Sequence, residues 1–550
     1  MGVYLNSKKS SAVYRKTMQS RYFVDKTALL EELIPIVDQS NPEPRCLCIT
    51  RPRRFGKTVM AGMVASFFGK GTDTSDIFQN LAIGRSEKYH LHRNKYNVIY
   101  ISMNEIPDQC STYSDYISRI RRRLLGDLLT AFPNAGIKPS DALWDAFNAV
   151  YEMETEGEFI FVLDEWDFIY HQDFATAADK AAYTQFLSVL LKDQPYVRMV
   201  YMTGILPIAK YSSGSELNMF CEYTMVNEER FSPYFGFTDP EVDDLFGRYL
   251  EQNPEHRNIT REGLQLWYDG YHTKSGIRVY NPRSVVLALS NNNLGNYWTN
   301  SGPYDELFYY IGANVDEVRD DVGRMIADIP VPAKVQEYAA SSMNLRTRDE
   351  IFSAMVVYGF LNYDNGFVSI PNRELMGKFS DMAQKEPSMG NLYRLARESE
   401  RMLYATKAGD TQTMEEILQY VHDTQSPLKV YNNEAELSAL IRWVYLRAID
   451  FYRIEREDQA GVGYADFIFY PFRMDDDAII LELKMDHTAE DAIRQIRDRR
   501  YVRKFEGKIG EKPVHTGRIL AVGIAYRKRD PEKKHSCRVE VLREALTKSL

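Results

Sequence analysis

Residues 51–58 read Arg51-Pro52-Arg53-Arg54-Phe55-Gly56-Lys57-Thr58. The last three positions fit the phosphate-binding loop pattern Gly-x-x-x-x-Gly-Lys-[Ser/Thr], although Arg51 stands where the first glycine belongs. A strand-like segment precedes the loop and a helix-like segment follows it, which is the context that this pattern requires. A helix N-terminus offers free N–H groups to phosphate oxygens. Lys57 would then reach the β- and γ-phosphates of a nucleotide, and the Thr58 hydroxyl would bind Mg²⁺.

An acidic strand end supplies the second half of this predicted site. Residues 159–165 read Phe159-Ile160-Phe161-Val162-Leu163-Asp164-Glu165, an apolar strand that ends in two acids. Such a strand places Asp164 beside the magnesium ion and positions Glu165 to activate water. A further strand ends at Thr203, which is placed to sense the γ-phosphate. We therefore predict ATP and Mg²⁺ as cofactors. The predicted nucleotide-binding residues are Arg53, Arg54, Phe55, Gly56, Lys57, Thr58, Asp164 and Thr203.

The first 300 residues alternate between strand-like and helix-like segments. Strands are expected at 45–50, 97–102, 159–163 and 197–203, and helices at 58–68, 113–132 and 180–191. This alternation predicts an α/β domain with a parallel sheet and helices on both faces. From about residue 239 the pattern becomes helical, and residues 315–425 are mostly helical with a hairpin-like interruption near 359–371.

Six short motifs in this part of the chain resemble the AAA-ATPase-like family. They lie at residues 22–27, 51–58, 163–167, 203–208, 235–238 and 279–282. The resemblance covers roughly residues 10–300 and implies an additional-strand P-loop fold. It also implies that Arg51 is a family feature, because the family's loop is itself of the Arg-Pro-Arg-Arg-Phe-Gly-Lys type. Trp166 replaces a more typical tyrosine, with little expected consequence. The identity of the arginine finger is left open, with Arg53, Arg54 and Arg230 as candidates.

A second group of charged residues lies near the C-terminus, around Asp466 and the tripeptide Glu482-Leu483-Lys484. A turn at residues 473–477 would join strands at 465–470 and 478–483 into a hairpin. Strand alternation points Glu482 and Lys484 to one face, where Asp466 can join them. The two carboxylates would bind one or two Mg²⁺ and polarise a water against a phosphodiester, and the lysine would stabilise the negative charge that develops on the phosphate. The alternative is a surface ion pair without catalytic function.

The surroundings of these carboxylates resemble the PD-(D/E)XK nuclease superfamily over about residues 430–530. A helix from about 432 to 452 precedes them, and a helix from about 489 to 505 and a strand at 518–526 follow. The resemblance implies that Asp466 and Glu482 are metal ligands, that Lys484 is catalytic and that Gln495 supports them. Either Glu434 or Glu436 would complete the site. The alternative is a degenerate member that keeps the fold and only binds.

The 550 residues suggest three to four domains, and 44% hydrophobic with 26% charged residues is an ordinary globular composition. No apolar run reaches the length that a bilayer requires, and the N-terminus does not resemble a signal peptide. The five scattered cysteines favour a reducing compartment, so we expect a cytoplasmic protein without a membrane partner. Residues 491–550 carry a net charge of +9 while the remainder carries −18, which favours a polyanion partner near the C-terminus.

These features predict four parts: a P-loop ATPase core (1–235), its helical lid (236–310), a mostly helical linker (311–428) and a restriction-endonuclease-like α/β domain (429–550). The predicted function is ATP binding and hydrolysis coupled to Mg²⁺-dependent cleavage of nucleic acid, with DNA favoured as the partner. One alternative is a nucleotide-dependent switch whose C-terminal domain only binds nucleic acid or another partner. The other is an interaction scaffold. A homo-oligomer is left open.

Overall fold

The computed structural model describes residues 2–41, 43–106, 110–153, 155, 157–208, 216–226, 229–254, 258–298, 316–335, 345, 347–385, 389–423, 434–460, 463–505, 515–527 and 534–546. The chain divides into two compact units. The first contains residues 1–310 and 332–374, and the second contains residues 311–331 and 375–550.

A five-stranded sheet in the order β2-β3-β4-β1-β5 forms the centre of the first unit, and all its neighbouring strands are parallel. Its strands are β1 (Cys46–Thr50), β2 (Asn97–Ser102), β3 (Phe159–Asp164), β4 (Val197–Gly204) and β5 (Cys221–Tyr223). Because the strands are parallel, the loop after β1 and the polar ends of β3 and β4 meet at one edge of the sheet. The predicted P-loop NTPase sheet is confirmed.

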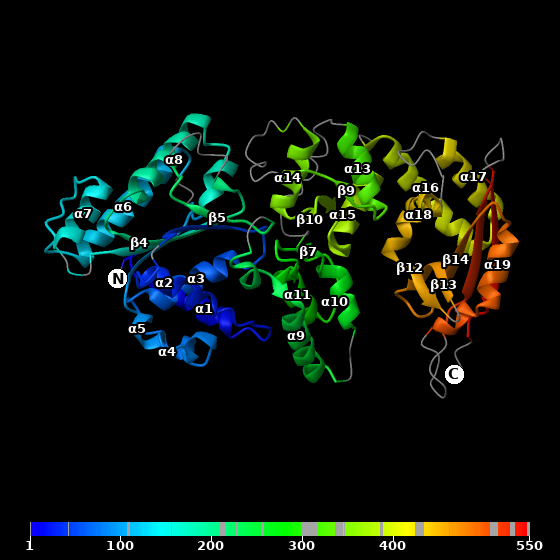
Figure 1. Ribbon diagram of the computed structural model, residues 1–550, viewed down its shortest axis with the longest axis horizontal. Helices are drawn as coiled ribbons and strands as arrows, with labels where there is room; N and C mark the ends of the chain where they lie inside the picture. Colours follow the sequence, from blue (N-terminus) through cyan, green and yellow to red (C-terminus); the bar gives the residue numbers. More distant parts are fainter. Residues whose placement is uncertain are drawn as a thin grey trace. The chain divides into compact units, whose positions relative to one another are not determined.

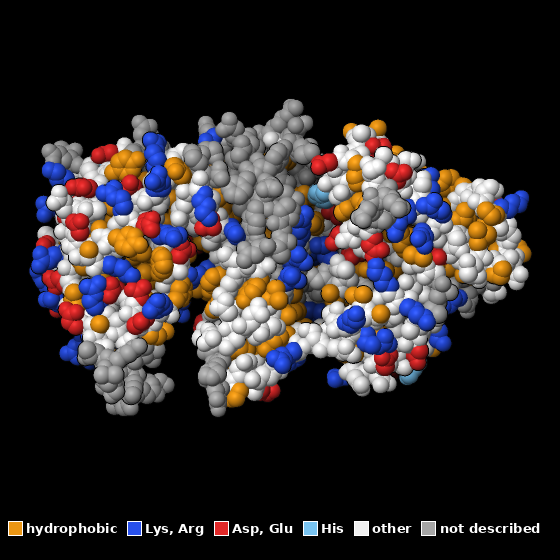
Figure 2. All heavy atoms as spheres, turned by 180° about the vertical axis from the view of Figure 1, so that it is seen from behind, with side chains coloured by type: hydrophobic (Ala, Val, Ile, Leu, Met, Phe, Trp, Pro, Cys, Tyr) orange, Lys and Arg blue, Asp and Glu red, His pale blue; other side chains and the backbone are white. Residues whose placement is uncertain are grey.

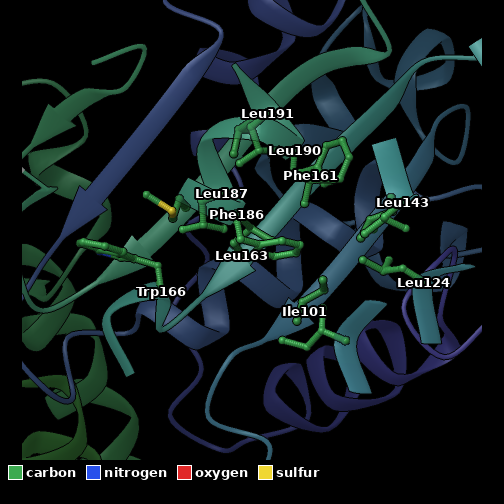
Figure 3. Packing of buried hydrophobic residues seen from close by; sticks show 14 of the residues in the cluster. Ile101, Leu124, Leu143, Phe161, Leu163, Trp166, Phe186, Leu187, Leu190 and Leu191 are labelled. Atoms are coloured by element: carbon green, nitrogen blue, oxygen red, sulfur yellow. The ribbon is translucent and has the colours of Figure 1, made fainter. Parts of the chain in front are cut away.

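Helices cover both faces of this sheet (Figure 1). One face carries α6 (Tyr113–Ala131), α7 (Leu143–Met153) and α8 (Ala177–Leu191), and the other carries α1 (Lys8–Met18), α2 (Leu29–Val37) and α3 (Lys57–Phe68). Alternate residues of β3 serve the two cores: Phe161 and Leu163 pack toward α8 (Figure 3), whereas Ile160 and Val162 belong to the core on the opposite face. The short helices α4 (Ser75–Phe78) and α5 (Tyr89–His92) follow α3.

The rest of the first unit is mainly helical. It contains α9 (Asp239–Gln252), α10 (Arg261–Tyr268), α11 (Pro282–Asn291), α14 (Arg348–Tyr358) and the start of α15 (Arg373–Lys385). A small sheet joins β6 (Phe237–Thr238), β8 (Arg278–Tyr280) and β7 (Tyr271–His272). The predicted hairpin is present as β10 (Asn362–Asp364) and β11 (Phe367–Ser369), and β9 (Val331–Pro332) completes its sheet. Its turn residues Asn365 and Gly366 both have positive φ, as a tight hairpin turn requires.

The second unit contains a five-stranded sheet in the order β12-β13-β14-β15-β16, in which only β14 and β15 pair in parallel. The strands are β12 (Tyr452–Ala460), β13 (Gly463–Pro471), β14 (Ala478–Met485), β15 (Ile519–Tyr526) and β16 (His535–Arg543). Helix α19 (Ala489–Asp498) covers one face through Ile493 and Ile496. On the other face the Phe469 ring lies 5.2 Å from Tyr445. The remaining helices are α13 (Asp316–Ile326), α16 (Asn391–Ala408), α17 (Thr411–Asp423) and α18 (Glu434–Val444).

Four details of this unit differ from the sequence prediction, and one of them is strand β16 (His535–Arg543), which was not predicted. The helix expected over 489–505 ends at Asp498, because Arg500 adopts a left-handed φ of 53° and a short 3-10 helix, η8 (Tyr501–Phe505), follows. The helix expected over 432–452 is divided into α18 and the 3-10 helix η7 (Leu446–Asp450). Strand β12 was not predicted, because its sequence is mostly charged. Charged side chains are common on an edge strand, where they discourage pairing with other chains.

We predict that Phe161→Ala lowers the free energy of unfolding of the first unit by about 3–5 kcal/mol, since the ring is fully buried at the centre of the sheet. Denaturant titration followed by circular dichroism measures this change, with Met153→Ala in α7 as the control, because Met153 is 65% exposed. Equal effects of the two substitutions would contradict this account of the core.

Candidate nucleotide and nuclease sites

The loop after β1 has the geometry of a phosphate cradle. Gly56 has a φ of +90° and precedes the first residue of α3, and an added Cβ would meet nothing within 4 Å. The glycine is therefore required by its backbone conformation rather than by crowding. The buried Lys57 Nζ donates to the carbonyls of Arg51 (2.8 Å) and Pro52 (2.9 Å). Burial lowers the pKa of Lys57 to about 8, while nearby carboxylates favour its charged form.

Arg51 does not face the phosphate position. Its guanidinium is buried, and Nη1 donates to the carbonyls of Thr50 and Tyr223, each at 2.7 Å. The same group lies over the Phe235 ring at 5.1 Å. Burial lowers the pKa of Arg51 to about 10. An arginine in place of the first loop glycine thus ties the start of the loop to β5 and to the segment after it.

The two acids at the end of β3 have different environments. Asp164 is fully buried: its Oδ1 accepts a hydrogen bond from Thr203 Oγ1 (2.6 Å), while its Oδ2 has no hydrogen-bond partner among the residues that the structure describes. Burial raises the pKa of Asp164, and the Thr203 and Thr58 hydroxyls and Lys57 oppose this rise. Glu165 adopts a left-handed φ of 55° and lines the neighbouring cavity. Burial and Asp164 raise its pKa.

Asp167 and Trp166 hold the ends of β3 and β4 together. Asp167 Oδ2 accepts hydrogen bonds from the backbone N–H groups of Ile205 (3.0 Å) and Leu206 (2.9 Å). The buried Trp166 donates from Nε1 to the Leu206 carbonyl at 3.2 Å. A Cβ on Gly204 would lie 2.5 Å from the Trp166 ring, which explains the glycine after Thr203. Trp166 and Asp167 therefore fix the strand ends next to Asp164, and these two residues are called the support beneath Asp164 below.

A cavity of about 670 Å³ lies in front of the loop, within the usual size range of ligand pockets. Its lining includes seven predicted site residues, namely Arg53, Arg54, Phe55, Gly56, Lys57, Thr58 and Glu165. Apolar side chains such as Phe23, Val286 and Trp298 form other parts of the wall. Arg283 also lines the cavity, and the sequence analysis did not identify it. The motif at 279–282 could have indicated Arg283, because this arginine directly follows the motif.

The three arginine-finger candidates have different positions. Arg53 and Arg54 line the cavity, and burial together with the nearby Arg283 and Arg53 charges lowers the pKa of Arg54. Arg230 instead lies over the Phe231 ring at 4.8 Å and donates to the Glu32 carbonyl at 3.3 Å. Its contacts are those of a structural residue.

The predicted C-terminal site residues meet on β13, β14 and α19. The β13–β14 hairpin pairs Phe467 with Leu481, and this register brings Asp466 beside Glu482. Asp466 Oδ2 accepts a hydrogen bond from the Leu483 N–H at 2.7 Å. Lys484 Nζ donates to Glu482 Oε1 at 3.1 Å, and Gln495 Nε2 donates to the same oxygen.

Glu482 is the most perturbed acid of this group. It is 2% exposed, and burial together with the nearby Asp466 raises its pKa to about 7. Its Oε2 is buried, with no hydrogen-bond partner in the described part of the chain. The structure describes no group of three or more His, Cys, Asp and Glu side chains that could hold a metal ion. The side chains of Glu434 and Glu436, one of which is predicted to complete the site, lie outside the described residues.

Basic residues are frequent from residue 494 to residue 504, that is, in α19, in η8 and between them. The exposed ones are Arg494, Arg497, Arg499, Arg500, Arg503 and Lys504. Arg494 and Arg497 form ion pairs with Asp491 and Glu540, so these two are partly neutralised. Figure 2 shows Lys and Arg side chains interspersed with Asp and Glu over one face of the molecule. The net charge of the C-terminal stretch is therefore a weaker indication of its partner than the local basic group beside Gln495.

The strand order and the two sites define a P-loop NTPase domain followed by a PD-(D/E)XK-type α/β domain. Residues 14–213 match the model of the family described as Predicted AAA-ATPase, and residues 433–526 match that of the PD-(D/E)XK nuclease superfamily. The chain thus contains a domain of each of these families, as the sequence motifs predicted. In the part of the chain that the structure describes, no helix has the length and apolar character needed to cross a bilayer.

Solved structures give distant similarities. The Walker-type ATPase of Pyrococcus abyssi is 13% identical, with 64% of this chain and 95% of that one covered and a TM-score of 0.35. The Aeropyrum pernix ORC2 protein, solved as ADPNP–ADP complexes, is 10% identical over 69% of this chain and 98% of that one, with a TM-score of 0.32. At these scores the fold assignment depends on strand order and the family models. Comparison with curated proteins gives no match.

We predict that Glu482→Gln changes how the stability of the metal-free protein depends on pH. The folded-state pKa of about 7 lies above the ordinary 4.5, so the folded protein binds more protons between these values and its stability falls as pH rises through them. The glutamine variant lacks this loss and should be on the order of 2–3 kcal/mol more stable than wild type at pH 8 but not at pH 4. Thermal unfolding in EDTA at both pH values measures this, and a constant difference would contradict it.

Proposed function

We propose that this protein binds and hydrolyses ATP with Mg²⁺ in its first unit, and cleaves phosphodiester bonds of nucleic acid, DNA in particular, with Mg²⁺ in its second. The observation that carries the proposal is a feature common to both sites. Each has a buried carboxylate oxygen without a hydrogen-bond partner among the described residues, and each has a lysine nearby. A buried carboxylate oxygen left unpaired is costly, and a bound cation would remove that cost.

In the first unit, each residue has a proposed role that its position supports. Lys57 would exchange its two loop carbonyls for phosphate oxygens of ATP, since both are strong acceptors. Thr58 and Asp164 would hold Mg²⁺, and Thr203 would orient Asp164 while responding to the γ-phosphate. Glu165, with its raised pKa, would accept the proton of the attacking water. Arg53 and Arg54 would contact the phosphates from the cavity wall.

In the second unit, Asp466 and Glu482 would hold the metal ion, together with Glu434 or Glu436. Bound there, Mg²⁺ would polarise a phosphate oxygen and lower the pKa of a bound water. Lys484 would stabilise the negative charge that develops on the phosphate. Gln495 would keep Glu482 oriented, because it donates to Oε1 and leaves Oε2 for the metal. The exposed basic residues of α19 and η8 would contact the backbone phosphates.

One observation favours a second candidate, a nucleotide-dependent switch whose C-terminal domain binds nucleic acid without cleaving it. At the C-terminal site the described residues bring two carboxylates together, Asp466 and Glu482, and no third His, Cys, Asp or Glu side chain of the described residues joins them. This candidate predicts DNA affinity without Mg²⁺-dependent cleavage.

We predict that wild type cleaves duplex DNA in the presence of Mg²⁺, and that Asp466→Ala lowers the cleavage rate at least 100-fold, because one metal ligand is lost. Linear and circular duplexes, incubated with and without ATP, provide the measurement. Asp475→Ala removes an exposed carboxylate from the turn of the same hairpin and should cleave at the wild-type rate. Cleavage that is insensitive to Asp466 would contradict the nuclease, whereas DNA binding without cleavage would favour the switch.

We predict that Lys57→Ala abolishes measurable ATP binding and changes the effect of ATP on cleavage, since the loop loses the ammonium group that is proposed to bind the β- and γ-phosphates. Binding of a fluorescent ATP analogue and the ratio of cleavage rates with and without ATP are the two readouts. If the variant kept both nucleotide binding and ATP-sensitive cleavage, the proposed coupling would be wrong.

A further inference from the structure

A turn far along the chain contacts three parts of the nucleotide site. It consists of Tyr358, the last residue of α14, and of Gly359 and Phe360, which follow that helix. The Tyr358 ring lies 6.2 Å from that of His171, whose Nε2 lies 3.7 Å from Asp167. The Phe360 ring lies 5.8 Å from Trp298, whose side chain lines the cavity. One short turn therefore contacts the support beneath Asp164 and the wall of the cavity.

Gly359 brings the same turn against the phosphate-binding loop. A Cβ at this position would lie 2.6 Å from Cβ of Pro52, and its φ of 83° is in the left-handed region. Its carbonyl accepts a hydrogen bond from the Tyr271 hydroxyl at 2.9 Å. The Tyr271 ring in turn packs edge-on against Phe55 at 5.0 Å. The close approach of Gly359 to Pro52 and its backbone conformation both require glycine. The turn is therefore packed directly against the phosphate-binding loop.

The segment that carries this turn ends at a buried acid. Glu374 is 1% exposed, and its Oε1 accepts hydrogen bonds from the backbone N–H groups of Tyr297 and Trp298, the latter at 2.6 Å. Its Oε2 accepts from Ser284 Oγ at 2.7 Å. Trp298 lines the cavity, and Ser284 follows Arg283, which also lines it. The carboxylate thus joins two stretches of the cavity wall.

Glu374 also lies at a chain boundary. It is in the first turn of α15, and the next residue, Leu375, belongs to the second unit. A helix is a rigid element, so a displacement of its first turn is passed to the residues that follow. The acid that joins the cavity wall is therefore the last residue of the first unit before the chain continues into the unit that carries Asp466 and Glu482.

We propose that residues 358–360 and Glu374 form a coupling element. The turn positions the nucleotide site, and Glu374 transmits the change that nucleotide binding causes in this site to α15 and thereby to the second unit. This inference rests on the proposed ATP binding. A nucleotide that shifts Trp298 or Arg283 changes the hydrogen bonds that Glu374 accepts from Tyr297, Trp298 and Ser284. The ATPase site consequently includes residues outside the matched range 14–213, and communication with the second unit follows the covalent chain.

Hydrogen exchange of residues 375–385 with and without ATP tests this inference without using nuclease activity. In wild type, ATP should change exchange in α15. In Glu374→Gln, which has similar size but presents one oxygen acceptor fewer to Ser284 and the two N–H groups, the change should disappear at an ATP concentration that saturates the variant, whose own Kd for ATP is measured alongside. Phe360→Ala should raise the KM for ATP about tenfold. Phe367→Ala in the hairpin that follows this turn is the control, because its side chain is 48% exposed.

Three results separate the possibilities. ATP binding with a change in α15 that Glu374→Gln removes supports the coupling element. Normal ATP binding without any change in α15, or with a change that persists in Glu374→Gln, overturns the coupling and leaves the proposed ATPase intact. Failure of wild type to bind ATP overturns the proposed function and the coupling with it. If Glu374→Gln does not fold, as judged by circular dichroism, Phe360→Leu replaces it, with the same change in α15 expected to weaken.

Discussion

A carboxylate oxygen that is buried without a hydrogen-bond partner is costly for a folded protein. In the described part of this chain such oxygens belong to Asp164, Glu216 and Asp269 in the first unit and to Glu482 in the second, and Asp164 and Glu482 each have a lysine nearby. In the first unit Asp164 is held by Thr203, and the strand ends around it are fixed by Asp167 and Trp166. In the second, Glu482 is held by Lys484 and Gln495. In both cases hydrogen bonds fix one oxygen of the carboxylate, and the other has no hydrogen-bond partner among the described residues.

In both sites a buried apolar β-strand carries the acid at or near its end. Asp164 ends a fully buried strand of a parallel sheet, and Glu482 lies near the end of β14, which pairs in parallel with β15. Apolar residues upstream anchor each strand in its core, so the acid is brought to a defined place that local flexibility does not change. Phe161 and Leu163 anchor the strand that carries Asp164 (Figure 3), and Ile480 anchors the strand that carries Glu482.

The sequence predicted what depends on short-range patterns and missed what depends on distant contacts. Alternating strands and helices gave the parallel sheet, and the Asp466 and Glu482 spacing gave the hairpin. Strand β12 was missed because its charged edge lacks an apolar pattern, and the end of α19 because Arg500 provides no glycine or proline signal. The burial of Arg51 and the position of Arg283 depend on residues far along the chain. The four-part domain division, the roles of the site residues, the cytoplasmic location and oligomerisation remain predictions.

The proposed function requires two separate cation sites in one chain, one used with nucleotide and one without. Bound Mn²⁺ can be counted by electron paramagnetic resonance, with and without a non-hydrolysable ATP analogue. The analogue should add a site that Asp164→Asn removes, while Asp466→Asn should remove a site that is present without nucleotide. Mn²⁺ binding that neither substitution changes would contradict it.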